Sequence, residues 1–267
     1  MTRSLGSFAG ARSLPSPEPD DSIRAAMIDS LVSPEILAMK RMVRDFVDRE
    51  LIPAERTVEE TGEVPPALIA QMRELGLFGL RIPADYGGLG LDMLSYCLVS
   101  EELTRAHSAY RALIQINNGI GSKCLVLAGS EEQKQRYLPA LASGDKIAAF
   151  ALTEPEAGSD AANLRTTATR DGGDWVLNGI KHFITNGPAA DYVTVLALTE
   201  PDKRAKGIST FIVEKDRPGF RVSRIQETMG PRGYHQGELL FEDCRVPAEN
   251  LVGEPGTGFK TALQCLS

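Results

Sequence analysis

Two short segments in the middle of the chain combine polar and aromatic residues in patterns that favour ligand binding. The first, residues 150–160, reads FALTEPEAGSD: a short apolar strand, a hydroxyl, an acid and a proline, then a tight turn of small residues. Such a turn exposes successive backbone N–H groups, which suit anionic oxygens. Thr153 and Ser159 add donors for a phosphate or for the polar edge of a ring. An ordinary surface turn has the same features, so that alternative stays open.

The second segment, residues 178–187, reads NGIKHFITNG. Phe183 precedes Thr185 by two residues in a predicted strand, and alternation along a strand places both side chains on one face. They could supply an aromatic wall and a hydrogen bond to a flat heterocycle. A core phenylalanine beside a solvated threonine is the alternative.

Other chemistries find no support in the sequence. The loops GGLGLD, GIGSK and GEPGTGF match neither GxGxxG nor GxxxxGK[ST], so a nucleotide cofactor requires a non-Rossmann arrangement. The three histidines lack metal-ligand spacing, and we expect no metal. The four cysteines form no CxxC pair, which favours reduced thiols and a cytoplasmic protein. The formal charge of -7 argues against nucleic acid, and no apolar run is long enough for membrane insertion.

The elements that carry these segments change character near residue 147. Before it, apolar spacing predicts helices beginning at Ser33, after Pro65, near Asp92 and at Ser130, where Ser130 and Gln133 have the capping-box form. After it, strands are predicted at 165–169 and 175–177 around a DGGD hairpin turn, and at 192–197, 208–213 and 238–241. Helices followed by strands in separate blocks predict an α+β chain.

We therefore predict four regions: a disordered leader over 1–32, an all-α domain over 33–147, a β-barrel-like or β-sandwich domain over 148–252, and the start of a C-terminal helical domain over 253–267. The leader has basic residues and serines typical of a mitochondrial presequence, but acids follow at 18, 20 and 21. The last region, GFKTALQCLS, would expose an apolar helix face, which predicts a truncated chain.

In this order and separation, the two segments resemble the acyl-CoA dehydrogenase family. TEPEAGSD is similar to the family's flavin-binding signature, and KHFITNG to the segment against the isoalloxazine. RELGLFGLRIPADYGGLGLD, SEEQKQRYLPALASG and MGPRGYHQGELLFEDCRVPAENLVGEPGTGF agree with the same family. The resemblance extends from Ser33 to Ser267.

The resemblance implies a FAD site between the β domain and the helices. The residues matching its flavin contacts are Phe150, Leu152, Thr153, Ser159, Phe183, Ile184 and Thr185. Ser159 would also touch the thioester, and many members have Trp where this chain has Phe183. The implied reaction is α,β-dehydrogenation of an acyl-CoA, with electrons passed to an electron-transfer flavoprotein. The oligomeric state that the resemblance implies is a homotetramer. The base, a glutamate, would come from beyond Ser267, which leaves Glu154 structural.

Arg111 lies in HSAYRALIQINN, which resembles the helix of glutaryl-CoA dehydrogenases where an arginine binds the distal carboxylate. The segment MGPRGY departs from that subgroup, and a surface salt bridge is the alternative for Arg111. Two other functions also remain open: a flavin oxidase or monooxygenase on the same fold, and a non-catalytic two-domain module.

Overall fold

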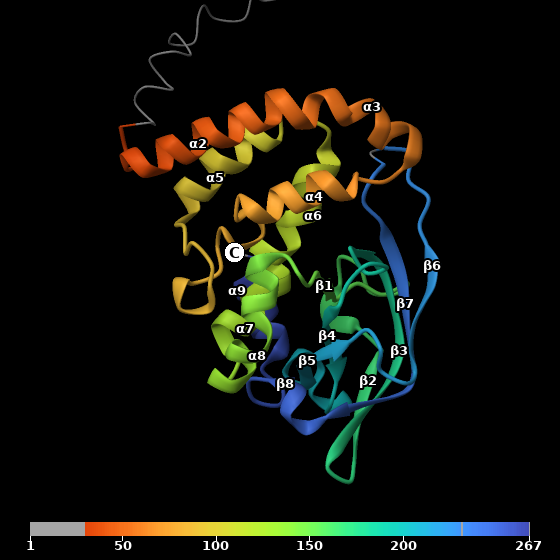
Figure 1. Ribbon diagram of the computed structural model, residues 1–267. Helices are drawn as coiled ribbons and strands as arrows, with labels where there is room; N and C mark the ends of the chain where they lie inside the picture. Colours follow the sequence, from red (N-terminus) through yellow and green to blue (C-terminus); the bar gives the residue numbers. More distant parts are fainter. Residues whose placement is uncertain (1–29, 231, 267) are drawn as a thin grey trace, which may run out of the picture.

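The computed structural model describes residues 30–230 and 232–266, in which helices come first and strands second. Figure 1 shows the helices gathered on one side and the sheet on the other. The α+β prediction is therefore confirmed. Most of the predicted leader, residues 1–29, lies outside the described residues.

The helical part begins with α2, which passes through one π-helical turn (η1) into α3. Later helices begin where the sequence predicts: Asp92 caps α5 by accepting from the Ser95 N–H at 2.8 Å, and Ser130 and Gln133 form the capping box of α8. Ser33 occupies the N-cap of α2, but without a side-chain capping bond. The elements are α2 (Pro34–Phe46), η1 (Val47–Leu51), α3 (Ile52–Thr61), α4 (Pro66–Glu74), η2 (Leu77–Gly79), η3 (Ala84–Tyr86), α5 (Met93–Leu103), α6 (Ser108–Asn118), α7 (Ile120–Ala128) and α8 (Glu131–Ser143).

One apolar core joins α2 to α6. Val43, Val58 and Met72 are fully buried in it, so three separate helices contribute to the same cluster. Tyr110 of α6 is also buried, and its hydroxyl donates to the carbonyl of Leu51 at 3.0 Å, inside the π-helical turn. This bond satisfies a carbonyl where the regular helix pattern changes.

The strands form one mixed sheet in the order β6-β7-β3-β2-β4-β5-β8, with β1 parallel to β4. The predicted DGGD hairpin joins β2 and β3, which pair antiparallel from Asp171 and Asp174 outward. The sequence prediction missed β6. The strands are β1 (Ala148–Ala151), β2 (Thr167–Asp171), β3 (Asp174–Thr185), β4 (Tyr192–Leu198), β5 (Ile208–Glu214), β6 (Phe220–Ile225), β7 (Gln236–Pro247) and β8 (Leu251–Val252), with η4 (Ala161–Asn163), η5 (Pro201–Gly207) and η6 (Ala248–Asn250) between them.

The sheet curls around its own core, as a barrel-like arrangement requires. Trp175 on β3 meets Phe211 on β5 edge to face, with ring centroids 5.4 Å apart. Leu239 and Val246 of β7 belong to the same buried cluster as Val193 of β4. Strands from both ends of the sheet order therefore share one apolar interior.

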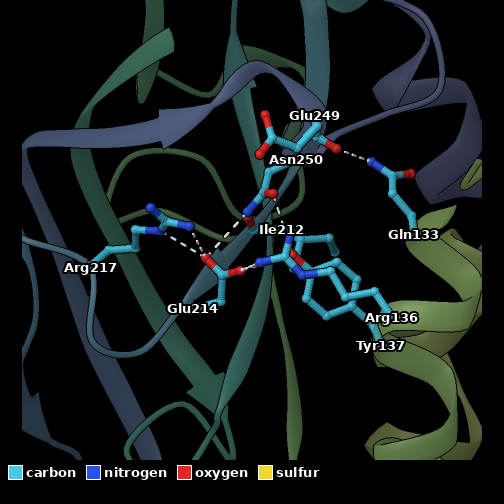
Figure 2. Close-up of polar contacts among 8 residues, drawn as sticks. All are labelled: Gln133, Arg136, Tyr137, Ile212, Glu214, Arg217, Glu249 and Asn250. Atoms are coloured by element: carbon cyan, nitrogen blue, oxygen red, sulfur yellow. Dashed lines mark hydrogen bonds and ion pairs between the residues drawn. The ribbon is translucent and has the colours of Figure 1, made fainter.

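The helical and sheet parts meet along α7 and α8. Figure 2 shows Gln133 of α8 donating to the carbonyl of Glu249, at 2.6 Å, and Arg136 and Tyr137 reaching Glu214 at the end of β5. Gln133 also donates to the carbonyl of Leu251 at 2.8 Å. The final helix, α9 (Gly258–Leu266), begins where the sequence predicts and packs against α7 and β5. None of the helices in the described part of the chain has the length and apolar character needed to cross a bilayer.

Candidate cofactor site

A cavity of about 280 Å³ lies where the two segments predicted to bind a ligand meet the helices. Its volume is near the lower end for small-molecule sites and suits a planar ring system. Six of the eight predicted site residues line it, and α6, α7 and α9 complete the wall. The lining residues are Ile116, Ile120, Phe150, Leu152, Thr153, Phe183, Ile184, Thr185 and Leu266.

The main chain holds the two predicted segments side by side. The N–H of His182 donates to the carbonyl of Thr153 at 2.8 Å, so the turn after β1 lies against β3. Phe150 is nearly buried at the end of β1, and Ile184 is 2 % exposed. Segments about 30 residues apart in sequence thus form adjoining walls of one cavity.

Phe183 reaches the cavity through a strand irregularity that simple alternation does not describe. Its φ of 56° is in the left-handed region, and the pairing of β3 with β7 shifts register between Lys181 and Ile184. Phe183 and Thr185 line the same cavity, but the irregular backbone means that more than regular strand alternation places them there. The bulge also lets Ile184, the residue between them, line the same space.

Phe183 is 56 % exposed, whereas most aromatic side chains here are buried. Its ring packs edge-on against the ring of His182, with centroids 4.0 Å apart. A strained backbone that holds a large exposed aromatic at a cavity is typical of a binding position. A planar ligand could therefore pack on the ring without first displacing other side chains.

A buried ion pair lies beside the cavity. The ammonium of Lys181 is 2.7 Å from the carboxylate of Glu154, and both side chains are almost fully buried. Burial lowers the pKa of Lys181 to about 8 despite the opposing charge of Glu154. Burial acts to raise the pKa of Glu154, but the charge of Lys181 and the hydrogen bonds from Arg165 and Thr166 outweigh this effect. The pKa of Glu154 therefore lies below its ordinary value. Sequence reasoning missed Lys181.

Two predicted site residues lie away from the cavity lining. Ser159 is exposed in the turn after Gly158, and Arg111 is half-buried on α6. The Arg111 guanidinium donates to the Gln115 side-chain carbonyl at 2.6 Å, one turn further along the helix. The structure thus pairs Arg111 with an amide, and the salt bridge considered from the sequence is replaced by this contact.

The cavity is chemically suited to a flat, mostly apolar ring system with polar edges. Isoleucine, leucine and phenylalanine side chains dominate its lining, and Thr153 and Thr185 add hydroxyl groups. Among the residues that the structure describes, no Asp or Glu lines it. Ile116, Ile120 and Leu266 were not predicted, because only the packing of α6, α7 and α9 on β1 and β3 brings them here. These residues fit the ring portion of a flavin.

Comparison with known families agrees with this geometry. The model of the acyl-CoA dehydrogenase N-terminal domain matches residues 33–145, and that of the acyl-CoA dehydrogenase middle domain matches residues 149–244. The chain belongs to the acyl-CoA dehydrogenase family.

Relatives and solved structures have the same family names. An acyl-CoA dehydrogenase of Bacillus subtilis is 45 % identical over 236 residues, which cover 88 % of this chain and 62 % of the relative. Butyryl-CoA dehydrogenase from Megasphaera elsdenii superimposes with a TM-score of 0.83 at 36 % identity, covering 88 % of this chain and 62 % of that one. The chain spans about three fifths of the length of the curated relatives it matches.

Three further solved structures bear on the cofactor and on the electron acceptor. A chain in a study of the electron-transferring flavoprotein of Acidaminococcus fermentans matches with a TM-score of 0.84 and 41 % identity, covering 88 % of this chain and 62 % of that one. An acyl-CoA dehydrogenase from Bacillus anthracis, complexed with FAD, matches with a TM-score of 0.78 and 39 % identity, and the match covers 88 % of this chain and 40 % of that one. A prolyl acyl carrier protein oxidase matches with a TM-score of 0.80 and 33 % identity, and the match covers 88 % of this chain and 63 % of that one.

Proposed function

We propose that this protein binds FAD and takes part in the α,β-dehydrogenation of an acyl-CoA thioester. The observation that carries the proposal is the single cavity onto which both predicted flavin-contacting segments converge. Family membership and the FAD complex of the Bacillus anthracis relative support the same cofactor. When bound, FAD would accept the hydride that leaves the β carbon of the substrate.

The residues of this chain would bind and orient the flavin ring. Phe183 would pack against it, and Thr153 and Thr185 would hydrogen-bond its polar edge. Phe150, Leu152 and Ile184 would exclude water from the ring and make its surroundings apolar. Ser159, exposed beyond the cavity, would contact the pyrophosphate or the thioester portion rather than the ring.

We further propose that the base that removes the α proton is not Glu154. Its carboxylate accepts hydrogen bonds from Lys181 and from the N–H groups of Arg165 and Thr166, and it lies outside the cavity lining. A carboxylate held by three donors at a depressed pKa is a weak base. The catalytic carboxylate would therefore come from outside residues 30–230 and 232–266.

Electron transfer flavoprotein is the electron acceptor that we propose, because a structural neighbour comes from a study of such a protein. The neighbouring oxidase favours a second candidate, in which reduced flavin gives its electrons to oxygen. Reoxidation in air separates the two: seconds or faster indicates an oxidase, and slow reoxidation supports the dehydrogenase. A homotetramer, a cytoplasmic location and a dicarboxyl substrate held by Arg111 stay predictions.

The test is the visible spectrum of the purified chain supplied with FAD, before and after anaerobic acyl-CoA. A bound flavin spectrum that stays oxidised supports a cofactor site without its base. Bleaching of the bound flavin would show that a base lies within these residues, contrary to the assignment above. Absence of any bound flavin would count against the FAD site and favour the non-catalytic module.

A further inference from the structure

One buried ion pair connects three segments behind the cavity wall. The Lys181 ammonium contacts the Glu154 carboxylate at 2.7 Å and donates to the Leu152 carbonyl at 3.1 Å. The same carboxylate accepts from the N–H groups of Arg165, at 2.5 Å, and Thr166, at 3.0 Å. The turn after β1, the approach to β2 and the middle of β3 therefore meet at a single pair of charges.

This pair lies immediately behind residues that line the cavity. Leu152, whose carbonyl receives the ammonium, lines it directly, and Phe183 follows Lys181 by two residues. The bond from the His182 N–H to the Thr153 carbonyl adds a second tie between the same segments. Movement of the Lys181 side chain would therefore shift both walls relative to each other.

Stability alone does not account for charges at this place. Removing two ions from water is costly, and well-packed apolar residues of similar volume often stabilise a fold equally well. An ion pair adds a fixed orientation of the segments it joins, because the ammonium donates to a carboxylate and a carbonyl at once. Here those two acceptors belong to the segment opposite the strand that carries Phe183.

We propose that Lys181 is a positioning residue for the flavin: by joining Glu154 and the Leu152 carbonyl to β3, it holds the two cavity walls in the geometry that the ring requires. The inference rests on the proposed function in naming flavin as the ligand. A wall formed before the ligand arrives avoids the cost of ordering these loops on binding.

Three variants of the 267-residue chain test this role: Lys181→Met, the double variant Glu154→Gln with Lys181→Met, and Lys146→Met as the control. The control removes a different ion pair, with Asp191 at 3.0 Å, that lies away from the cavity lining. Thermal unfolding, FAD titration by fluorescence, and hydrogen exchange over residues 150–156 and 178–187 are measured for each.

The single variant leaves a buried carboxylate unpaired, so we expect a marked loss of stability. In the double variant no charge is left unpaired, and the single amide oxygen still accepts from one of the two N–H groups of Arg165 and Thr166, so stability recovers in part. FAD affinity nevertheless stays about tenfold below wild type in the double variant, equivalent to about 1.4 kcal/mol of binding. Lys146→Met binds FAD as wild type does.

FAD affinity that recovers together with stability in the double variant would overturn the positioning role. If the wild-type chain binds no FAD, the proposed cofactor fails, and hydrogen exchange then judges Lys181 independently. Faster exchange over 150–156 and 178–187 in the double variant, with α2 and α8 unchanged, supports the role. Wild-type exchange rates in those segments overturn it.

Discussion

The phenol of Tyr137 on α8 donates a 2.9 Å hydrogen bond to the carboxylate of Glu214 at the end of β5 (Figure 2). The same carboxylate receives the guanidinium groups of Arg136 and Arg217 and, at 3.3 Å, the amide of Asn250. Glu214 therefore accepts donors from α8, from the turn after β5 and from η6. This cluster fixes the helical part on the sheet, and with it the α6 and α7 side of the cavity.

At this contact we expect the largest loss of stability from replacing Gln133. Its side chain completes the capping box of α8 and also donates to the carbonyls of Glu249 and Leu251. Gln133→Ala removes all three bonds, so we expect it to lower the free energy of unfolding by about 2–3 kcal/mol. Chemical denaturation measures this. The control is Gln135→Ala, an exposed position on the same helix, which should cost less than about 0.5 kcal/mol.

The Glu214 cluster also predicts sensitivity to acid. Burial acts to raise the pKa of Glu214, but hydrogen bonds from Arg217 and Tyr137 outweigh it, and the net pKa lies below the ordinary value of 4.5. As the pH falls through 4.5, the unfolded chain therefore binds a proton before the folded one does. The stabilisation is complete above that pH and is lost progressively below it.

Glu214→Gln should accordingly be less stable than wild type at pH 7 and lose less further stability between pH 5 and pH 3. The measurement is urea unfolding at a series of pH values. Glu74→Gln, which alters an exposed carboxylate on α4, serves as the control and should follow the wild-type profile. Parallel profiles for Glu214→Gln and wild type would contradict the assigned role of the cluster.

The helix starts could be predicted because their signals are local. Asp92 and the pair Ser130 and Gln133 form caps within four residues of sequence, and the structure reproduces both. β6 was missed because its segment, FRVSRI, is largely exposed and basic, and only pairing with β7 makes it a strand. Local pattern therefore gives the class of fold, whereas edge pairing requires the partner strand.

The candidate site shows the same division. The resemblance of the two segments to acyl-CoA dehydrogenase motifs implied six residues that line one cavity. Lys181 could not be predicted, because its partner Glu154 lies 27 residues away and only the folded turn brings them together. The position of Phe183 depends on a bulge set by the register of β7, which alternation along one strand does not reveal.

Phe183 provides a direct test of the ring wall. Its side chain is exposed, so Phe183→Ala should change the unfolding free energy by less than about 1 kcal/mol. FAD affinity should nevertheless fall, by roughly 2- to 10-fold, because an aromatic contact contributes about 0.5–1.5 kcal/mol. Phe183→Trp retains the backbone strain and enlarges the aromatic face, and should bind FAD at least as tightly as wild type. Equal affinity of the Ala and Trp variants would show that the ring does not contact the flavin.

The cysteines report on the packing of α9. Cys97 is exposed, whereas Cys124, Cys244 and Cys265 are buried, and the Sγ atoms of Cys124 and Cys265 lie 3.2 Å apart between α7 and α9. Burial raises the pKa of Cys244 to about 11, which further suppresses its thiolate. We expect a disulfide reagent to titrate one thiol rapidly in the native chain and the other three only on unfolding, with Cys97→Ser abolishing the rapid phase. Rapid reaction of Cys124 or Cys265 in the native chain would mean that α9, which brings Leu266 to the cavity, does not pack against α7 in solution.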